Sequence, residues 1–208
     1  MAEPYRVFTS RLIPLAAENV DTDQIVPARY LKVTDKDGLA EALFRDRRFA
    51  EDGRLKDPPF VLDRPEMAGR RILLVGDNFG SGSSREHAPW ALAAWGIRAL
   101  ISTSFADIFN SNSLKNGLLP IQVDRPTHQR LFEIVERDPD VELTVDLAEQ
   151  GVLLPDGSTI GFEADPFSKL MLLAGTDEMG YLLGKLPDIE AWERRHPGRV
   201  DTTAAEAA

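Results

Sequence analysis

The segment from Ile72 to Ser102 constrains the fold more than any other part of the chain. It contains four successive elements: an apolar strand at Ile72–Val75, a glycine- and serine-rich loop at Gly76–Ser84, a helix at Arg85–Trp95 and a second apolar strand at Ala99–Ser102. Proline is tolerated only in the first turn of a helix, so Pro89 places the helix start near Ser84 or Arg85. Two parallel strands joined by a crossover helix are therefore predicted, with the loop at the carboxyl end of the first strand.

The rest of the chain extends this unit into a single α/β domain. The patterns predict strands at 6–15, 118–123, 141–147, 151–154 and 158–162, and helices at 105–112, 126–137, 167–174, 177–183 and 189–195. Asp156-Gly157 predicts a hairpin turn. Residues 1–199 are expected to form the domain and 200–208 a disordered tail. Residues 27–65 are irregular apart from a short helix near 39–44, which favours a mobile, substrate-facing excursion.

Charge and composition exclude several classes of function. The chain has 24 Lys and Arg against 34 Asp and Glu, a net charge of −10 that disfavours nucleic acids and anionic membranes. No stretch approaches the about 20 apolar residues of a spanning helix, and the first residues lack a signal core, so we expect a cytoplasmic protein. The absence of cysteine excludes disulfides, a thiol nucleophile and an iron–sulfur cluster ligated by this chain. The three histidines lack metal-ligand spacing, so no metal site is expected.

The loop from Gly76 to Arg85 carries the most informative chemistry. It lacks the lysine of a phosphate-binding P-loop, and Arg85 occupies the third glycine position of a dinucleotide fingerprint. Glycines let backbone amides approach a ligand closely, and the amides at the start of a helix favour binding of an anion. The Arg85 guanidinium is suited to a carboxylate. Ser83 and Ser84 place hydroxyls in this positive field, which favours loss of a proton from a serine. A helix cap with a tight turn is the alternative interpretation.

Other polar residues carry a weaker signal. The segment Asn19–Pro27 reads, on spacing alone, as a turn held by side-chain hydrogen bonds. Asp107, Asn110 and Asn112 are interpreted as capping and turn residues, and His87 as a structural histidine.

Four motifs, in this order, resemble the swivelling domain of the aconitase superfamily. They are Asn19-Val20-Asp21-Thr22-Asp23, Gly80-Ser81-Gly82-Ser83-Ser84-Arg85-Glu86-His87-Ala88, Phe105-Ala106-Asp107-Ile108-Phe109 and Gly117-Leu118-Leu119-Pro120. The continuation to Leu92 is similar to the small-subunit family of bacterial 3-isopropylmalate dehydratases, and the resemblance covers about 5–195. It implies a single three-layer β/β/α swivelling domain in a heterodimer, beside a large subunit that carries a [4Fe–4S] cluster.

The resemblance also implies an activity and a set of site residues. The family's hydro-lyase, active only with the large subunit, isomerises 2-isopropylmalate to 3-isopropylmalate through 2-isopropylmaleate in leucine biosynthesis. Ser83 would be the base that removes a proton alpha to a carboxylate, and Arg85 would bind a substrate carboxylate. The substrate-binding residues would be Ser84, Thr22, Asp23 and Gly82. The cluster iron on the large subunit would take the departing hydroxyl.

Several alternatives stay open at this point. A sister isomerase acting on citramalate/citraconate or homocitrate would share both loops. A different class is a non-catalytic carboxylate-binding or regulatory module, although the net charge disfavours RNA. The residues that read the substrate side chain are also open: Arg29 or Lys32 could touch the substrate, and Leu31 or Val33 could accommodate an isopropyl group. The higher oligomeric state is not predicted.

Overall fold

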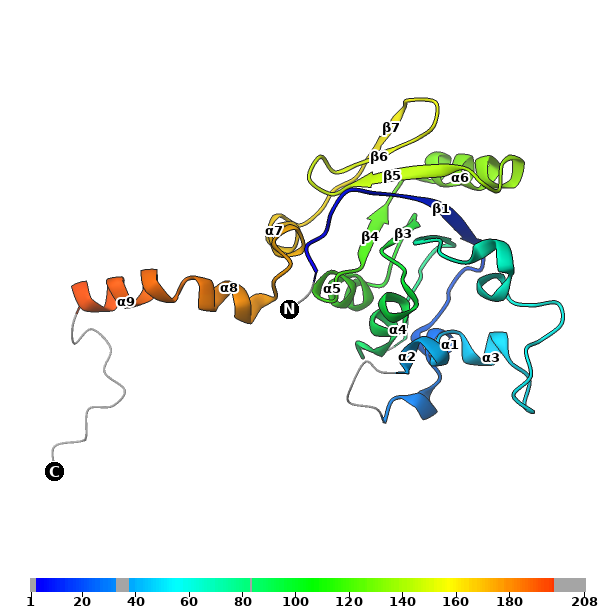
Figure 1. Cartoon of the computed structure of the whole chain (residues 1–208), viewed down its shortest axis with the longest axis horizontal. Helices are drawn as coiled ribbons and strands as arrows, with labels where there is room; N and C mark the ends of the chain where they lie inside the picture. Colours follow the sequence, from blue (N-terminus) through cyan, green and yellow to red (C-terminus); the bar gives the residue numbers. More distant parts are fainter. Residues whose placement is uncertain (1–2, 33–37, 83, 197–208) are drawn as a thin grey trace.

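A computed structural model describes residues 3–32, 38–82 and 84–196 (Figure 1). Its strands are β1 (Phe8–Leu15), β2 (Ile72–Val75), β3 (Ala99–Ser102), β4 (Leu119–Gln122), β5 (Glu142–Asp146), β6 (Gly151–Leu153) and β7 (Thr159–Gly161). Its α-helices are α1 (Thr22–Ile25), α2 (Leu39–Ala42), α3 (Arg45–Arg48), α4 (His87–Trp95), α5 (Asp107–Lys115), α6 (Arg125–Arg137), α7 (Pro166–Ala174), α8 (Glu178–Gly184) and α9 (Leu186–Arg195). Single 3-10 turns occur at Ala28–Tyr30, Val61–Asp63 and Pro65–Met67.

The strands form one curled seven-stranded sheet in the order β4-β3-β2-β1-β5-β6-β7. Strands β1 to β4 are its parallel half, and the predicted parallel pairing of β2 with β3 is confirmed. Successive side chains of a strand point to opposite faces, so Ile13 and Leu73 join one core cluster while Leu12 and Ile72 join another. Helices α2, α4 and α5 contribute side chains to the first cluster and cover that face.

The antiparallel half of the sheet covers the other face. β5 pairs antiparallel with β1, and β6 and β7 continue the ladder outward (Figure 1). Val145 and Val152 from this half lie in the same core cluster as Leu74 and Leu119 of the parallel half. The layers are therefore antiparallel sheet, parallel sheet and helices, which confirms the predicted β/β/α architecture. Gly157 adopts a φ of 82° in the turn between β6 and β7, where the hairpin was predicted.

Some element boundaries differ from the predictions. Helix α4 begins at His87 rather than near Ser84 or Arg85, although Pro89 still lies in its first turn. Side chains of α5 bind the Ser84 carbonyl and the Glu86 carboxylate just before this start. Helix α9 begins three residues earlier than predicted, because Pro187 is favoured in a first helical turn. The predicted tail at 200–208 lies outside the described residues.

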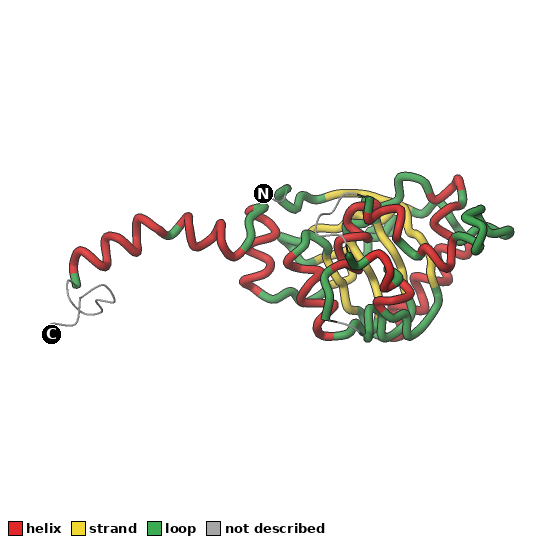
Figure 2. Tube along the Cα trace, turned by 90° about the horizontal axis from the view of Figure 1, so that it is seen from below, coloured by secondary structure: helices red, strands yellow, loops and turns green. Residues whose placement is uncertain are grey.

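Two long segments pack very differently. The excursion at 27–65 lies against the core, with Leu43 and Phe44 fully buried; its motion stays a prediction. Helices α8 and α9 instead form an arm that leaves the globular body, as Figures 1 and 2 show. Among the described residues, no helix has both the length and the apolar character that crossing a membrane requires.

Candidate active site

The two polar motifs meet at the carboxyl edge of the parallel half. β1 and β2 are parallel neighbours, so the segments that follow them leave the sheet side by side. The Gly80 amide donates to the Val20 carbonyl at 2.7 Å, and the Thr22 amide donates to the Ser81 carbonyl at 2.8 Å. Asp21 and Ser81 form an isolated parallel bridge that extends the strand pair by one step. The loop from β1 and the loop from β2 thus form one backbone unit.

Two asparagines that contact each other, one in each loop, make the turns that follow β1 and β2. Asn19 and Asn78 both have a φ of 53°, in the left-handed region that asparagine enters more readily than most residues. The Asn78 side-chain amide donates to the Asn19 side-chain oxygen at 2.9 Å, and the Asn19 backbone amide donates to the Asp77 carbonyl at 2.8 Å. The sequence pattern predicted this role for neither asparagine.

An ion pair joins the two predicted site segments. The Arg85 Nη2 donates to Asp23 Oδ1 at 3.0 Å. The Arg85 side chain is 43% exposed and the Asp23 side chain 60% exposed, so solvent weakens their attraction. The structure therefore brings together two of the predicted residues and leaves the guanidinium accessible to a competing carboxylate.

Thr22 and Gly82 fill the contact between the loops. Thr22 is 6% exposed, and its Oγ1 has no hydrogen-bond partner within the described ranges. A buried hydroxyl without a partner is destabilising, so Thr22 Oγ1 keeps an unused hydrogen-bonding capacity at the contact between the two loops. Gly82 has a φ of 103°, and a Cβ at this position would lie 3.7 Å from Thr22 Oγ1. Glycine is needed here for its backbone conformation, and it also brings the loop backbone close to Thr22.

Ser84, the neighbour of the predicted base, is held by a different element. Ser83 lies outside the described residues. Ser84 is exposed, and its backbone carbonyl accepts a hydrogen bond of 3.0 Å from the Asn112 side chain of α5. One turn later, the Asn116 side-chain amide donates to Glu86 Oε2 at 2.9 Å. From the sequence, Asn112 was predicted only to be a cap or turn residue. Its spacing of four from Asn116, which places both side chains on one helix face, was the signal that could have identified this role.

The carboxyl edge also carries a third charged contact. Thr103 Oγ1 and the Arg125 guanidinium both donate to the carboxylate of Asp77, the second residue after β2. The hydrogen bond from Thr103 and then that from Arg125 hold the pKa of Asp77 below its usual value. This carboxylate is therefore ionised and fixed at neutral pH, and it anchors the base of the loop.

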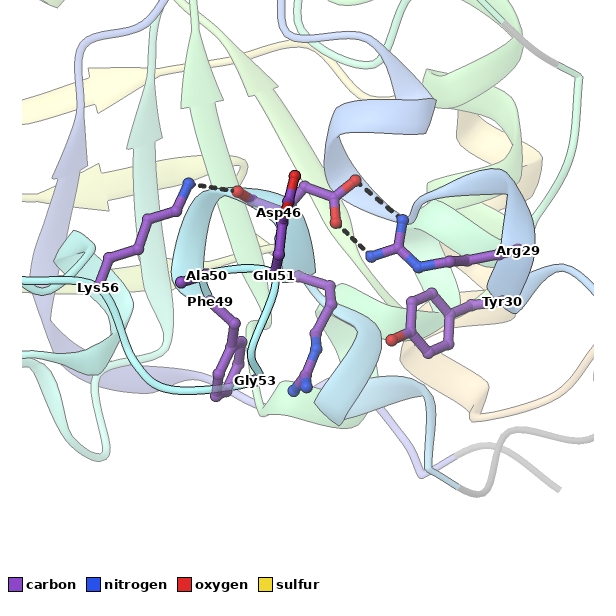
Figure 3. A pocket seen from close by; sticks show the side chains of 9 residues that line it. Arg29, Tyr30, Asp46, Phe49, Ala50, Glu51, Gly53 and Lys56 are labelled. Atoms are coloured by element: carbon purple, nitrogen blue, oxygen red, sulfur yellow. Dashed lines mark hydrogen bonds and ion pairs between the residues drawn. The ribbon is translucent and has the colours of Figure 1, made fainter.

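The candidates for reading the substrate side chain lie elsewhere. Arg29 lines a surface pocket in the excursion, where its guanidinium binds both carboxylate oxygens of Asp46 (Figure 3). That pocket shares no described lining residue with the predicted site. Lys32 is exposed and Leu31 packs partly against the core, whereas Val33 lies outside the described residues. The described contacts assign no substrate role to these residues.

The chain offers few groups that could hold a metal or cluster. No set of three or more histidine, aspartate and glutamate side chains within the described ranges could bind a metal ion. The whole sequence contains no cysteine, so it provides no thiolate for an iron–sulfur cluster. The site residues are instead carboxylate, guanidinium, hydroxyl and backbone amide groups.

Comparisons with known proteins agree with this arrangement. Residues 5–126 match the aconitase C-terminal domain family and residues 129–166 match the LeuD_N family. The 3-isopropylmalate dehydratase small subunit of Roseiflexus castenholzii is 56% identical over 201 residues, 97% of this chain and 98% of the relative. That of Solibacter usitatus is 53% identical over 201 residues, 97% of this chain and 99% of the relative.

A solved structure has a similar fold. The crystal structure of 3-isopropylmalate dehydratase (leuD) from Methanocaldococcus jannaschii superposes with a TM-score of 0.64 at 27% identity, covering 90% of this chain and 99% of that one. The family and the enzyme class inferred from the four motifs are thereby confirmed. The chain belongs to the 3-isopropylmalate dehydratase small-subunit family, whose members are subunits of aconitase-like hydro-lyases.

Proposed function

We propose that this chain is the small subunit of a hydro-lyase that isomerises 2-isopropylmalate to 3-isopropylmalate through 2-isopropylmaleate in leucine biosynthesis. The names of its relatives support both this reaction and a large-subunit partner. The observation that carries the proposal is the ion pair between Arg85 and Asp23, which places an exchangeable guanidinium where the two family motifs meet. A cytoplasmic location follows from the same biosynthetic role.

The two subunits divide the chemistry. A chain without cysteine provides none of the thiolates that hold a [4Fe–4S] cluster, so we assign that cluster to the large subunit. This chain then binds the substrate carboxylate and moves a proton. The groups that do this lie at the edge of the sheet, where backbone hydrogen bonds fix the two loops to each other.

Arg85 acts as the carboxylate clamp. A substrate carboxylate takes the position that Asp23 Oδ1 occupies on the Arg85 guanidinium, because both are planar anions that match the same donors. The exchange costs little because the existing pair is exposed and weak. Thr22 Oγ1, buried beside Gly82, then supplies a further polar contact to the bound substrate.

Ser83 moves the proton. In its alkoxide form, Ser83 Oγ accepts the proton from the carbon alpha to the carboxylate held by Arg85. A positive charge and amide donors at this loop would stabilise such an alkoxide. Loss of the proton and of the hydroxyl from adjacent carbons gives 2-isopropylmaleate and water. Readdition with the two positions exchanged gives 3-isopropylmalate.

Reconstitution tests this function. The full chain is combined with its cluster-loaded large subunit, and turnover is measured side by side on 2-isopropylmalate, citramalate and homocitrate. We expect a clear preference for 2-isopropylmalate, and neither turnover nor iron-dependent absorbance from the small subunit alone. A preference for another substrate would assign the chain to a sister isomerase. No turnover on any of them, with the complex formed, would leave only a carboxylate-binding module.

A further inference from the structure

The arm formed by α8 and α9 extends outward as one nearly continuous helix (Figures 1 and 2). The Lys185 amide donates to the Tyr181 carbonyl at 3.2 Å, and the Ile189 amide donates to the Lys185 carbonyl at 3.0 Å. Helical bonding therefore continues past the junction despite Pro187. The arm covers residues 178–195 and is about 27 Å long at the rise of an α-helix.

One face of the arm is apolar and exposed. We call it the arm stripe; it consists of Met179, Leu182, Leu183, Leu186, Ile189 and Trp192. Each of these side chains is between 41% and 63% exposed. Their spacing of three and four residues places them along one side of a helix. Contiguous exposed apolar surface of this kind marks an interaction site.

The described contacts between the arm and the body lie near the base of the arm. Lys115 Nζ of α5 lies 3.4 Å from Glu178 Oε1, and the rings of Phe167 and Tyr181 pack edge to face at 5.3 Å. Within the described ranges, α9 makes no hydrogen bond, ion pair or ring contact with the body. These base contacts direct the arm outward while the arm stripe stays uncovered.

The arm lies beyond both matched family models, which end at residues 126 and 166. It nevertheless falls within the 201 residues that align with relatives named small subunits. The arm is therefore shared with full-length small subunits and is no appendage peculiar to this chain.

We propose that the arm stripe docks into an apolar groove on the large subunit, with its side chains as successive anchors along the groove. This inference rests on the proposed function, which supplies the partner. The position of α5 favours that partner. Lys115, at the carboxyl end of α5, pairs with the arm base, and Asn112, one turn earlier, holds the loop that carries Arg85. Because α5 connects the two places, a subunit that covers the site also lies next to the base of the arm.

A second copy of this chain fits the arm stripe less well. Two helices about 27 Å long and about 10 Å across bury at most roughly 1,000 Å² together. Specific, stable interfaces bury about 1,200–2,000 Å². Two copies that each carry a net charge of −10 also repel each other.

The test measures binding of the full chain to its large subunit, independently of turnover. The double variant Leu183→Glu/Leu186→Glu places two charges in the groove and is expected to weaken binding by at least about 30-fold. The matched control is Leu153→Glu on β6, a residue 45% exposed on the body, for which affinity should stay within about 2-fold. A chain ending at Gly184 keeps both base contacts and should lose affinity like the double variant. Thermal unfolding of each variant confirms that the body stays folded.

The outcomes distinguish failure of the docking proposal from failure of the proposed function. Wild-type affinity in the double variant, or no binding by the wild-type chain, overturns the docking proposal. A wild-type dimer that the double variant dissociates, with binding to the large subunit intact, would assign the arm stripe to a second copy and overturn it as well. A complex that depends on the arm but turns over none of the three substrates supports the docking and withdraws the proposed function.

Discussion

The excursion at 27–65 and the arm at 178–195 differ in an unexpected way: the segment with less regular secondary structure is the one that packs against the core. In its described residues, 27–32 and 38–65, the excursion has short helices and 3-10 turns as its helical elements, yet Leu43 and Phe44 within it are fully buried. The arm is helical along its length, yet none of its side chains is buried. The body packs against the first segment, whereas the second has an apolar face that the rest of the described chain leaves exposed.

A buried ion pair accounts for much of the excursion's attachment. The Arg48 side chain is 8% exposed and that of Asp63 7% exposed, and Arg48 Nη2 donates to Asp63 Oδ1 at 2.7 Å. The guanidinium also lies 4.4 Å from the ring centroid of Trp95 on α4 and donates to the Leu43 carbonyl at 3.2 Å. The irregular segment is thus fixed to the helix that follows the site loop.

Breaking this ion pair should give the largest loss of stability. Asp63→Ala leaves the buried Arg48 charge without its partner and should lower the free energy of unfolding by about 3–5 kcal/mol. The control is Asp52→Ala, which removes an exposed pair with Arg54 and should cost under about 1 kcal/mol. Urea denaturation measures both. Equal, small losses would show that the excursion is attached as loosely as the arm.

The site between these regions should respond in binding more than in folding. Arg85→Lys removes the planar guanidinium and should raise the KM for 2-isopropylmalate about tenfold, or about 1.4 kcal/mol, with a smaller change in kcat. Arg130→Lys, in an exposed pair with Asp156 on the antiparallel side, should leave both constants unchanged. Steady-state kinetics of the reconstituted complex measures them. Similar, mild effects of the two substitutions would favour the helix-cap interpretation of the loop.

Asp77, at the base of the site loop, should make a pH-dependent contribution to the free energy of unfolding. Because hydrogen bonds from Thr103 and Arg125 lower the folded-state pKa of Asp77, its stabilisation is complete above the unfolded value of about 3.9 and is lost as pH falls through the folded value. Asp77→Asn should therefore cost about 1 kcal/mol at pH 7, and the gap to wild type should close below about pH 4. Denaturation curves across this range test it; a gap that widens at low pH contradicts it.

The arm should give the smallest effect on folding. Leu183 is 61% exposed, so Leu183→Ala in the isolated chain should change the free energy of unfolding by under about 0.5 kcal/mol. The same substitution at the fully buried Leu43 should cost about 2–5 kcal/mol. A large loss from Leu183→Ala would mean that the arm packs on the body in solution, which would remove the contrast between the two regions.

Local patterns were enough to predict most of the fold. The apolar run Ile72–Val75, the helix end at Trp95 and the turn at Asp156-Gly157 each depend on residues close in sequence. The start of α4 was predicted two residues too early: Ser84 and Arg85 lie before the helix, where Asn112 of α5 donates to the Ser84 carbonyl and Asn116 to the Glu86 carboxylate. Such contacts span about 30 residues, and no local propensity encodes them.

The site divides in the same way. The motifs identified Arg85 and Asp23, and the parallel pairing of their strands explains why they meet. The pairing of Asn19 with Asn78 was not predictable, since it joins residues 59 positions apart and depends on two left-handed backbone turns. The apolar spacing of α8 and α9 was visible in the sequence, but only the structure shows that the body leaves this face uncovered.

The most direct test of the account is the kcat of Ser83→Ala in the reconstituted complex, measured on 2-isopropylmalate together with KM. The account predicts a fall in kcat of about 10²–10⁴-fold with little change in KM, because only proton transfer is lost. Ser81→Ala, which preserves the backbone contact with Thr22, should retain near wild-type kcat. A Ser83→Ala complex that forms normally and keeps kcat within a few-fold of wild type would contradict the assignment of the base to this chain.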